Sequence, residues 1–226
     1  MKTEFNLFFK RYEELLIMAD TVFDRVGKEY PQCVKCGIGC SDCCNALFDL
    51  TLIEALYVNH HFNRQFEGRE KEQLTERANR SDRDICKIKK QAYRDFEAGR
   101  KSENEILEAL AEKRVRCPLL NDEEKCDLYE YRPVTCRFYG VPTSIGGQGH
   151  TCGISAFEKG EQYPTVNLDI VHRKLYEISA ELVKSLKTGY VKMADMLVPL
   201  SMAMITEYDD TYLGVDEAKE GDDSNG

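Results

Sequence analysis

The 226-residue chain contains no tryptophan, so aromatic packing depends on its Tyr and Phe side chains. It also lacks an apolar run of the ~20 residues that a membrane-spanning helix needs. The longest apolar run, near 191–205, is interrupted by Lys192, Asp195 and Pro199. Acidic residues, beginning with Glu4, enter the N-terminal segment too early for a signal peptide. We therefore expect a cytoplasmic protein with no membrane partner.

The sequence has no basic excess either. Its net charge is −9, and 207–226 alone contributes −7 through eight acidic residues and one Lys. The remaining 206 residues carry −2, which gives no electrostatic reason to expect binding to nucleic acid. The only glycine-rich stretch, 146–149, follows no strand pattern, so a nucleotide site is not indicated. The order of Ser, His and Asp indicates no catalytic triad.

What the sequence does contain is cysteine, at ten positions, nine of which fall into two blocks. The first block has five thiols within twelve residues: Cys33, Cys36, Cys40, Cys43 and Cys44. The second block has four: Cys117, Cys126, Cys136 and Cys152. The tenth, Cys86, lies in a helical pattern between Ile85 and Lys87, and we expect it to be an ordinary helix thiol.

Close cysteine spacing predicts metal binding. In a reducing compartment such thiols bind metal more often than they form disulfides, and a chain of this length can fold without disulfides. Two Cys separated by two residues can face one metal, as in Cys33-x2-Cys36 and Cys40-x2-Cys43. Thiolates suit zinc and iron–sulfur clusters. The competing interpretations are buried free thiols and a disulfide scaffold.

The kind of metal centre is less strongly indicated. Adjacent side chains such as Cys43 and Cys44 point in different directions, so they suit two metals, different irons of one cluster, or one ligand and one packing residue. This pair and the nearly all-sulfur donor set slightly favour an iron–sulfur cluster. Zinc stays an alternative, because Cys33-x2-Cys36-Gly37 also fits a zinc knuckle.

Two arginines flank Cys136 and are candidate cofactor-binding residues. Arg132 and Arg137 can donate hydrogen bonds to thiolate or cluster sulfur and offset its negative charge. Alternatively, Arg132 pairs with a nearby carboxylate, Glu130 or Asp127.

The second block has a recognisable motif: Cys126-x2-Tyr129-x2-Arg132-Pro133-x2-Cys136-Arg137-x-Tyr139-Gly140, with Cys117-Pro118-Leu119 upstream. It resembles the CxxCxxCC cysteine-cluster family, the YkgJ-type zinc- or iron-chelating domain, and Cys40-x2-Cys43-Cys44 resembles the family's other half. The resemblance covers 33–58 and 117–153. The chain departs from the family pattern by three residues between Cys36 and Cys40 and by the added Cys33, so either Cys33 or Cys36 is the ligand. The resemblance implies that the two blocks meet around metal.

Outside the blocks, apolar spacing predicts helices over 3–26, 52–63, 69–98 and 167–188, and one beginning after Ser102 and running through Val115. Capping boxes at Thr51-x2-Glu54 and Ser102-x2-Glu105 support two of the starts. His60 and His61 are expected to cap the end of their helix. The methionine-rich segment 190–206 is interpreted as a buried helix, with a protein partner or homodimer interface as the alternative.

These observations predict a mainly α-helical protein, with a helical frame around a loop-rich, cysteine-ligated metal centre. We expect one domain over 1–206 and a disordered acidic tail over 207–226. The function indicated is metal binding through an iron–sulfur or zinc centre, with electron transfer or redox sensing if a cluster is present. The alternatives are an enzyme related to flagellin lysine methylases, which have a similar cysteine module, and an interaction protein with structural zinc.

Overall fold

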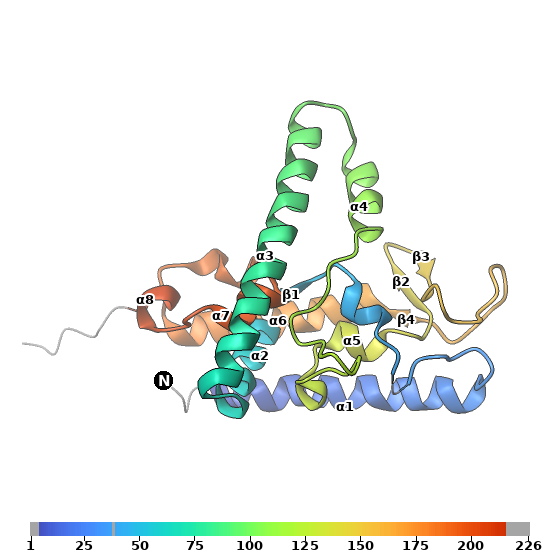
Figure 1. The fold of residues 1–226 in the computed structure, drawn as a ribbon, viewed down its shortest axis with the longest axis horizontal. Coiled ribbons are helices and arrows are strands. Elements are labelled where there is room, and N and C mark those ends of the chain that lie inside the picture. Colours follow the sequence, from blue (N-terminus) through green and yellow to red (C-terminus); the bar gives the residue numbers. More distant parts are fainter. Residues whose placement is uncertain (1–4, 38, 216–226) are drawn as a thin grey trace, which may run out of the picture.

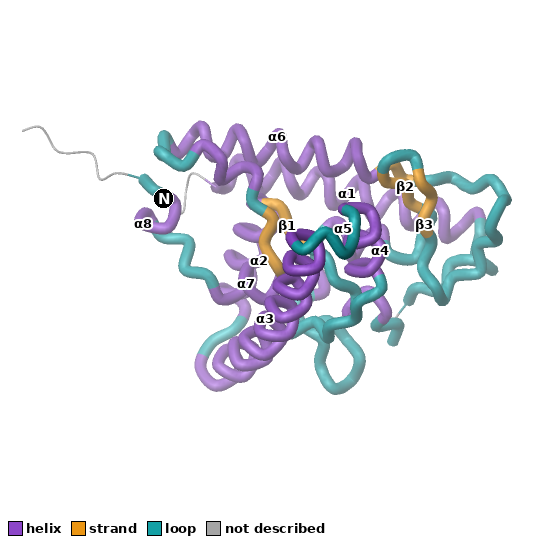
Figure 2. The backbone as a smooth tube through the Cα atoms, turned by 90° about the horizontal axis from the view of Figure 1, so that it is seen from above, coloured by secondary structure: helices purple, strands orange, loops and turns teal. Residues whose placement is uncertain are grey.

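The structure is a computed structural model that describes residues 5–37 and 39–215. It is mainly helical, as the sequence predicts. Helices α1 (Phe5–Glu29) and α6 (Leu168–Leu186) lie along the long axis of the molecule, and α3 (Gly68–Glu97) rises away from them (Figure 1). From above, α1 and α6 lie beside each other (Figure 2). Among the described residues, no helix is long and apolar enough to cross a membrane.

Helix α2 (Leu52–Gln65) lies at the centre of this frame and contacts α1, α6 and α7. It starts with the predicted capping box, in which the Glu54 carboxylate accepts hydrogen bonds from the Thr51 backbone N–H at 3.0 Å and from the Thr51 hydroxyl at 2.9 Å. Its first seven residues, 52–58, are all buried. Six of them are apolar, and the remaining one is Glu54. Burial on all sides explains why this segment is apolar without a polar stripe.

The remaining elements are short. The helices are α4 (Glu103–Ala111), α5 (Val134–Phe138), α7 (Leu200–Ile205) and α8 (Asp210–Leu213), with 3₁₀ turns at Asp42–Asn45, Tyr129–Tyr131 and Val191–Asp195. Strand β1 (Asp49–Thr51) pairs antiparallel with β5 (Leu197–Pro199), with Leu50 opposite Val198. Strand β2 (Thr143–Ile145) pairs antiparallel with β3 (Gln148–His150) and parallel with β4 (Val166–Asn167).

Two apolar clusters form the core. One joins α1, α2 and α6, with Tyr12 and Leu182 fully buried within it. The other joins α2, the first half of α3 and α7, and it includes Leu119 and Leu128 from the second cysteine block. The second block is therefore packed onto the helical frame by its leucines.

The predicted helices over 52–63, 69–98 and 167–188 are confirmed as α2, α3 and α6, and both capping boxes are present. The helix predicted over 3–26 is confirmed as α1 from Phe5 onward, and residues 3 and 4 lie outside the described residues. The helix predicted through Val115 ends instead at Ala111. The reason is a competing partner: the Val115 N–H donates to the Asn45 carbonyl at 2.9 Å, and Arg114 pairs with Ala46. These bonds require an extended backbone.

Segment 190–206 is not the single helix that the sequence suggests. It forms the 3₁₀ turn Val191–Asp195, strand β5 and helix α7, because Pro199 cannot continue a helix and precedes the first helical position of α7. Met193 and Met204 are buried in the two core clusters. The methionines therefore do not form one exposed face for a partner.

The disordered tail was expected to begin at residue 207, which is too early. Residues 207–215 are described, and Asp209 caps α8 by accepting a hydrogen bond from the Tyr212 N–H at 2.7 Å. Leu213 is completely buried, against the first core cluster. An apolar residue among acidic neighbours thus anchors this segment to the body. Residues 216–226 lie outside the described residues.

His60 and His61 do not cap the end of α2, which continues to Gln65. The His61 ring stacks on Tyr131, with 3.6 Å between ring centroids and 10° between ring planes. Burial, followed by repulsion from His60 and Arg64, lowers the pKa of His61 to about 4. The ring therefore packs in its neutral form.

This lowered pKa predicts a pH-dependent stability. The unfolded chain binds a proton near pH 6.5 and the folded chain near pH 4, so stability is lost as pH falls through this window. The loss is on the order of 1 kcal/mol, because partial exposure of the ring screens the charge. Urea unfolding of His61→Phe, which keeps the stack but cannot titrate, should lack this loss. The exposed His150→Gln variant should keep the wild-type profile. Equal profiles for wild type and His61→Phe would contradict the prediction.

Candidate functional site

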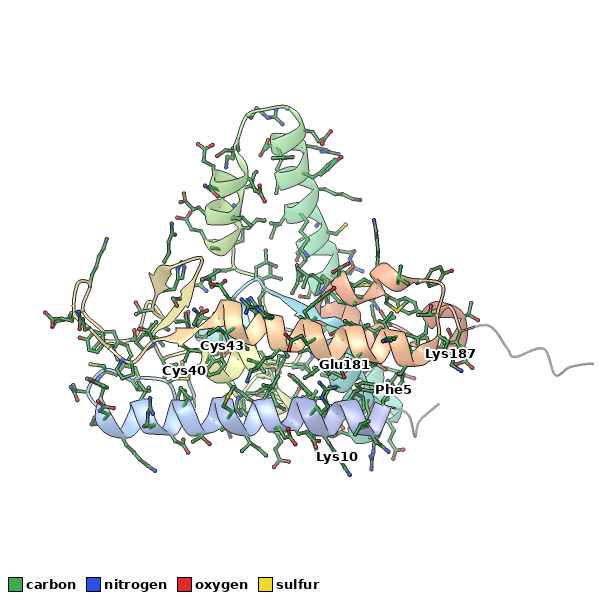
Figure 3. All side chains as sticks on the ribbon, turned by 180° about the vertical axis from the view of Figure 1, so that it is seen from behind. Phe5, Lys10, Cys40, Cys43, Glu181 and Lys187 are labelled. Carbon is green, nitrogen blue, oxygen red and sulfur yellow. The ribbon has the colours of Figure 1, made fainter. Side chains whose placement is uncertain are left out.

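The two cysteine blocks lie together in the fold, as the sequence predicts. The Cys117 N–H donates to the Cys44 carbonyl at 2.6 Å, and Val115 and Asn45 are paired in the same way. A short ladder of backbone bonds therefore joins segments that are some 70 residues apart in the sequence. In Figure 3, Cys40 and Cys43 lie near the C-terminal half of α1.

A cavity of about 600 Å³ lies between the blocks. Seven cysteines line it: Cys36, Cys40, Cys43, Cys44, Cys117, Cys126 and Cys136. The rest of its wall is largely apolar and includes Phe48, Ile85 and Leu200. The cavity thus combines a sulfur-rich wall with an apolar one.

Three cysteines stand apart from this wall. Cys33 is buried in the hydrophobic core. Its backbone N–H donates a hydrogen bond to the Tyr30 carbonyl, and its carbonyl accepts one from the Ala156 N–H. The structure therefore places Cys36, rather than Cys33, with the other thiols. The Cys152 thiol donates to the Asp42 carboxylate at 3.4 Å. Burial raises the pKa of Cys36 to about 11, and the nearby Cys40, Cys43 and Cys152 thiols add to this rise. Cys86 is exposed on α3, in agreement with its interpretation as an ordinary helix thiol.

Local turns present the thiols of the first block. The Cys40 N–H donates to the Gly37 carbonyl at 3.0 Å, and the Cys44 N–H donates to the Ser41 carbonyl at 3.0 Å. The second turn winds residues 42–45 into a 3₁₀ helix. Its tight winding brings adjacent thiols to one wall, with Cys43 Sγ and Cys44 Sγ 3.9 Å apart.

Different elements hold the second block. Cys126 pairs with Leu120 in an antiparallel bridge, which brings it beside Cys117. Asp127 anchors this loop by accepting hydrogen bonds from Arg77 at 2.9 Å and from Asn121 at 2.8 Å. Cys136 lies in α5, whose first N–H, from Val134, donates to the buried Glu54 carboxylate at 3.3 Å.

The thiols perturb one another's acidity. Hydrogen bonds from the thiols of Cys136 and Cys44 lower the pKa of Cys43, and the Arg132 charge lowers it further. The pKa values of Cys44 and Cys136 are raised by the same hydrogen bonds and by burial. Burial also raises the pKa of Cys117 to about 12 and of Cys126 to about 11. The site therefore stabilises one thiolate surrounded by protonated thiols.

Arg132 and Arg137 share a carboxylate partner that neither sequence alternative named. Arg137 is buried and donates to Asp20 of α1 and to the Arg132 and Glu130 carbonyl oxygens. Each of its guanidinium nitrogens thus donates to oxygen. Arg137 also lines the cavity, so a bond from one of its remaining N–H groups to a bound centre stays a prediction.

Arg132 lies 3.6 Å from Asp20 and 4.0 Å above the Tyr129 ring. Its pairing with Asp20 replaces the expected pairing with Glu130 or Asp127. It also lines the cavity, where its charge adds to the hydrogen bonds that lower the pKa of Cys43 and offsets a small part of the rise that burial causes in the pKa of Cys126.

Asp20, Glu54 and Asp42 are the site residues that sequence reasoning missed. Asp20 directly follows the buried Ala19 on α1, so an acidic residue beside an apolar stripe was the available signal. Glu54 was identified as a capping residue, but its bond to Val134 depends on the distant α5. The Asp42 contact with Cys152 spans 110 residues.

Comparison with known proteins adds no further constraint. The chain matches no protein-family model, no curated protein and no solved structure. Within the described residues, no three His, Cys, Asp or Glu side chains are already arranged to hold a metal ion. The candidate site thus rests on its shared cavity wall and the chemistry of its donors.

The Asp20–Arg137 pair predicts a measurable stability effect. Asp20→Asn removes the carboxylate that compensates the buried guanidinium, but Asp20 is itself 43% exposed. We expect the free energy of unfolding in urea to fall by about 1 kcal/mol, less than for a fully buried pair. The exposed Asp24→Asn variant, one turn later on α1, should change it by less than about 0.5 kcal/mol. Equal effects of both variants would contradict a role for this pair.

Proposed function

We propose that the cysteine-lined cavity binds a metal centre, and that an iron–sulfur cluster is its occupant in preference to zinc. The observation that supports this proposal is the wall itself. Seven thiols from two distant segments face one cavity. Buried thiols usually pack singly as small apolar groups, and such packing gives no reason for seven to gather at one surface.

The donors fit a soft metal. Cys43, Cys44, Cys117, Cys126 and Cys136 form an inner group linked by hydrogen bonds or mutual electrostatic effects. A single tetrahedral zinc ion needs four such ligands. Five inner thiols, including an adjacent pair, exceed that number and favour a polynuclear centre. The similarity of the motif to the YkgJ-type family supports metal binding without deciding between iron and zinc.

The acidity of the thiols also fits a site that requires its metal. Burial raises the pKa values of Cys117 and Cys126, and a hydrogen bond with Cys43 together with burial raises that of Cys136, so these thiolates are costly when no cation is present. A bound metal would replace those protons and remove that cost. Arg132 at the wall would offset part of the negative charge of the resulting centre.

A bound cluster would supply one-electron chemistry, and electron transfer or redox sensing is the function that follows. The polypeptide would hold the cluster through its thiolates, shield it with the apolar wall and tune its potential with Arg132. A reducing compartment such as the cytoplasm would keep the thiols available. Zinc in the same site would instead stabilise the fold.

Metal analysis of protein purified without oxygen from iron-sufficient cells tests this proposal. We expect iron and acid-labile sulfide in similar amounts, with a brown colour and broad visible absorbance. One or two zinc ions per chain, with no iron and no sulfide, would exclude the cluster and leave a structural metal module. Protein that contains neither metal, and that takes up neither when reconstituted anaerobically, would exclude metal binding altogether.

Three cysteine variants test the assignment of ligands. Cys136→Ser removes a cavity thiol and should abolish metal binding, with a loss of stability that can reach the order of 10 kcal/mol for a structural metal. Cys33→Ser alters a buried core thiol, so it should retain metal at a lower stability, by about 1–3 kcal/mol. Cys86→Ser alters an exposed thiol and should change neither.

Metal content per chain and urea unfolding are the measurements. Equal metal loss in Cys136→Ser and Cys33→Ser would contradict the placement of Cys33 outside the site. Metal retention in Cys136→Ser would contradict the role of Cys136.

A further inference from the structure

The cysteine-lined cavity is larger than a metal centre requires. Its volume is about 600 Å³. A four-iron cluster with metal–sulfur bonds of about 2.3 Å is ~6 Å across, so it takes up on the order of 200 Å³. A single zinc ion takes up less. The space that remains, on the order of 400 Å³, is within the range of ~300–1,000 Å³ that is usual for small-molecule sites.

One part of the cavity wall carries no thiol. It consists of residues from α3 and α7, namely Ser81, Ile85, Leu200 and Ser201. Ser81 and Ile85 are four residues apart on α3, so they share one face of that helix. Leu200 and Ser201 begin α7, which packs against α3 (Figure 1). We call these four residues the α3–α7 wall. A metal held at the thiolates, with bonds of about 2.3 Å, leaves this wall free for another group.

The α3–α7 wall is buried, although it lines a cavity. Each of its four residues is at most 8% exposed. The exposed residues Glu124, Lys125 and Tyr129 line the same cavity. The cavity therefore extends from solvent to a buried wall, and a small molecule that entered it would lose most of its contact with water.

The two serines of this wall present hydrogen-bond acceptors. The Ser81 hydroxyl donates to the Arg116 carbonyl at 3.2 Å, and the Ser201 hydroxyl donates to the Asp82 carboxylate at 3.4 Å. A hydroxyl has one proton and two lone pairs, so both oxygens can still accept a hydrogen bond but neither can donate one. A ligand that pairs with this wall must therefore supply the proton.

Charge at the α3–α7 wall favours a neutral ligand. None of its four residues is charged, and Ile85 and Leu200 offer an ion no partner. The Asp82 carboxylate behind Ser201 would also repel an anion. A hydroxyl group on an otherwise apolar molecule meets both requirements, because it is neutral and carries a proton to donate.

We propose that the cavity binds, beside its metal centre, a neutral and largely apolar small molecule that carries a hydroxyl group. Its apolar part packs on Ile85 and Leu200, and its hydroxyl donates to Ser81 or Ser201. The position beside a metal centre rests on the proposed function, but the binding itself does not. The ligand site and the metal centre can therefore be tested separately.

Equilibrium dialysis with three probes of similar size tests the chemical class. We expect 1-naphthol, which is neutral and has a hydroxyl, to bind the purified protein with a dissociation constant of about 10–100 µM. Naphthalene, which lacks the hydroxyl, should bind severalfold more weakly. The anion 1-naphthoate should bind at least ~10-fold more weakly, because the wall gives its charge no partner.

Variants of the wall locate the binding. Ser81→Ala/Ser201→Ala removes both acceptors, so it should weaken 1-naphthol binding about tenfold and leave naphthalene binding within about twofold. Because naphthalene binding reports an intact cavity, a misfolded variant would not give this difference. Ser185→Ala, which removes a helix hydroxyl bonded to the Leu182 carbonyl, should bind both probes like wild type.

A second variant fills the cavity. Leu200→Phe should weaken the binding of 1-naphthol and naphthalene alike, by at least ~10-fold, because the larger ring occupies their space. Leu197→Phe, at a position 64% exposed on β5, should bind both like wild type. Far-UV circular dichroism checks the helix content of each variant.

The inference is overturned if wild type binds 1-naphthoate as tightly as 1-naphthol, or binds neither. It is also overturned if Leu200→Phe binds the probes like wild type, or if the double serine variant binds 1-naphthol like wild type or loses both neutral probes equally. Metal content is measured on the same samples. Metal without 1-naphthol binding would overturn this inference alone, whereas 1-naphthol binding in protein that takes up no metal would support the ligand site and overturn the metal centre.

Discussion

The attachment of α5 to the helical frame is the constraint on which the cysteine cavity depends. This five-residue helix carries Cys136 but is too short to be stable alone. Two polar links hold it: the buried Glu54 of α2 accepts from the Val134 N–H, and the partly exposed Asp20 of α1 accepts from the buried Arg137. Since Glu54 also caps α2, one carboxylate fixes both the start of the central helix and the position of a cavity thiol. Its own pKa is raised by burial, which is the electrostatic cost of this arrangement.

The cavity has one wall that is largely apolar and one that is rich in thiols. Ile85 of α3 and Leu200 of α7 contribute to its apolar wall. Helix α5 supplies the Cys136 thiol, and loops and the 3₁₀ turn 42–45 supply the other six. Ile85 marks the point where α3 leaves the body, and it lines the cavity. The same helix therefore encloses the sulfur wall at one end and projects into solvent at the other. Its first half is held by packing on α7, whereas its second half has α4 for support.

Local patterns explain why the helices were predictable and their ends were not. Apolar spacing and capping boxes act over three to seven residues, so α1, α2, α3 and α6 are readable from sequence. The end of α4 depends on the Val115–Asn45 bond, and the stacking of His61 depends on Tyr131. Leu213 likewise anchors an acidic segment through contacts with the distant core. Such partners lie too far away in the chain for a local pattern to identify.

The sequence by itself determined the helical class, because apolar spacing and capping residues act over a few positions. That the two cysteine blocks meet was implied by the resemblance of their motif to a known family, and not by spacing. Tertiary structure decided which thiols face the cavity. It buried Cys33 in the core, turned Cys36 to the cavity wall and gave Arg132 and Arg137 the partner Asp20. The physical reason is that spacing limits which side chains can meet, whereas burial and long-range hydrogen bonds select among them.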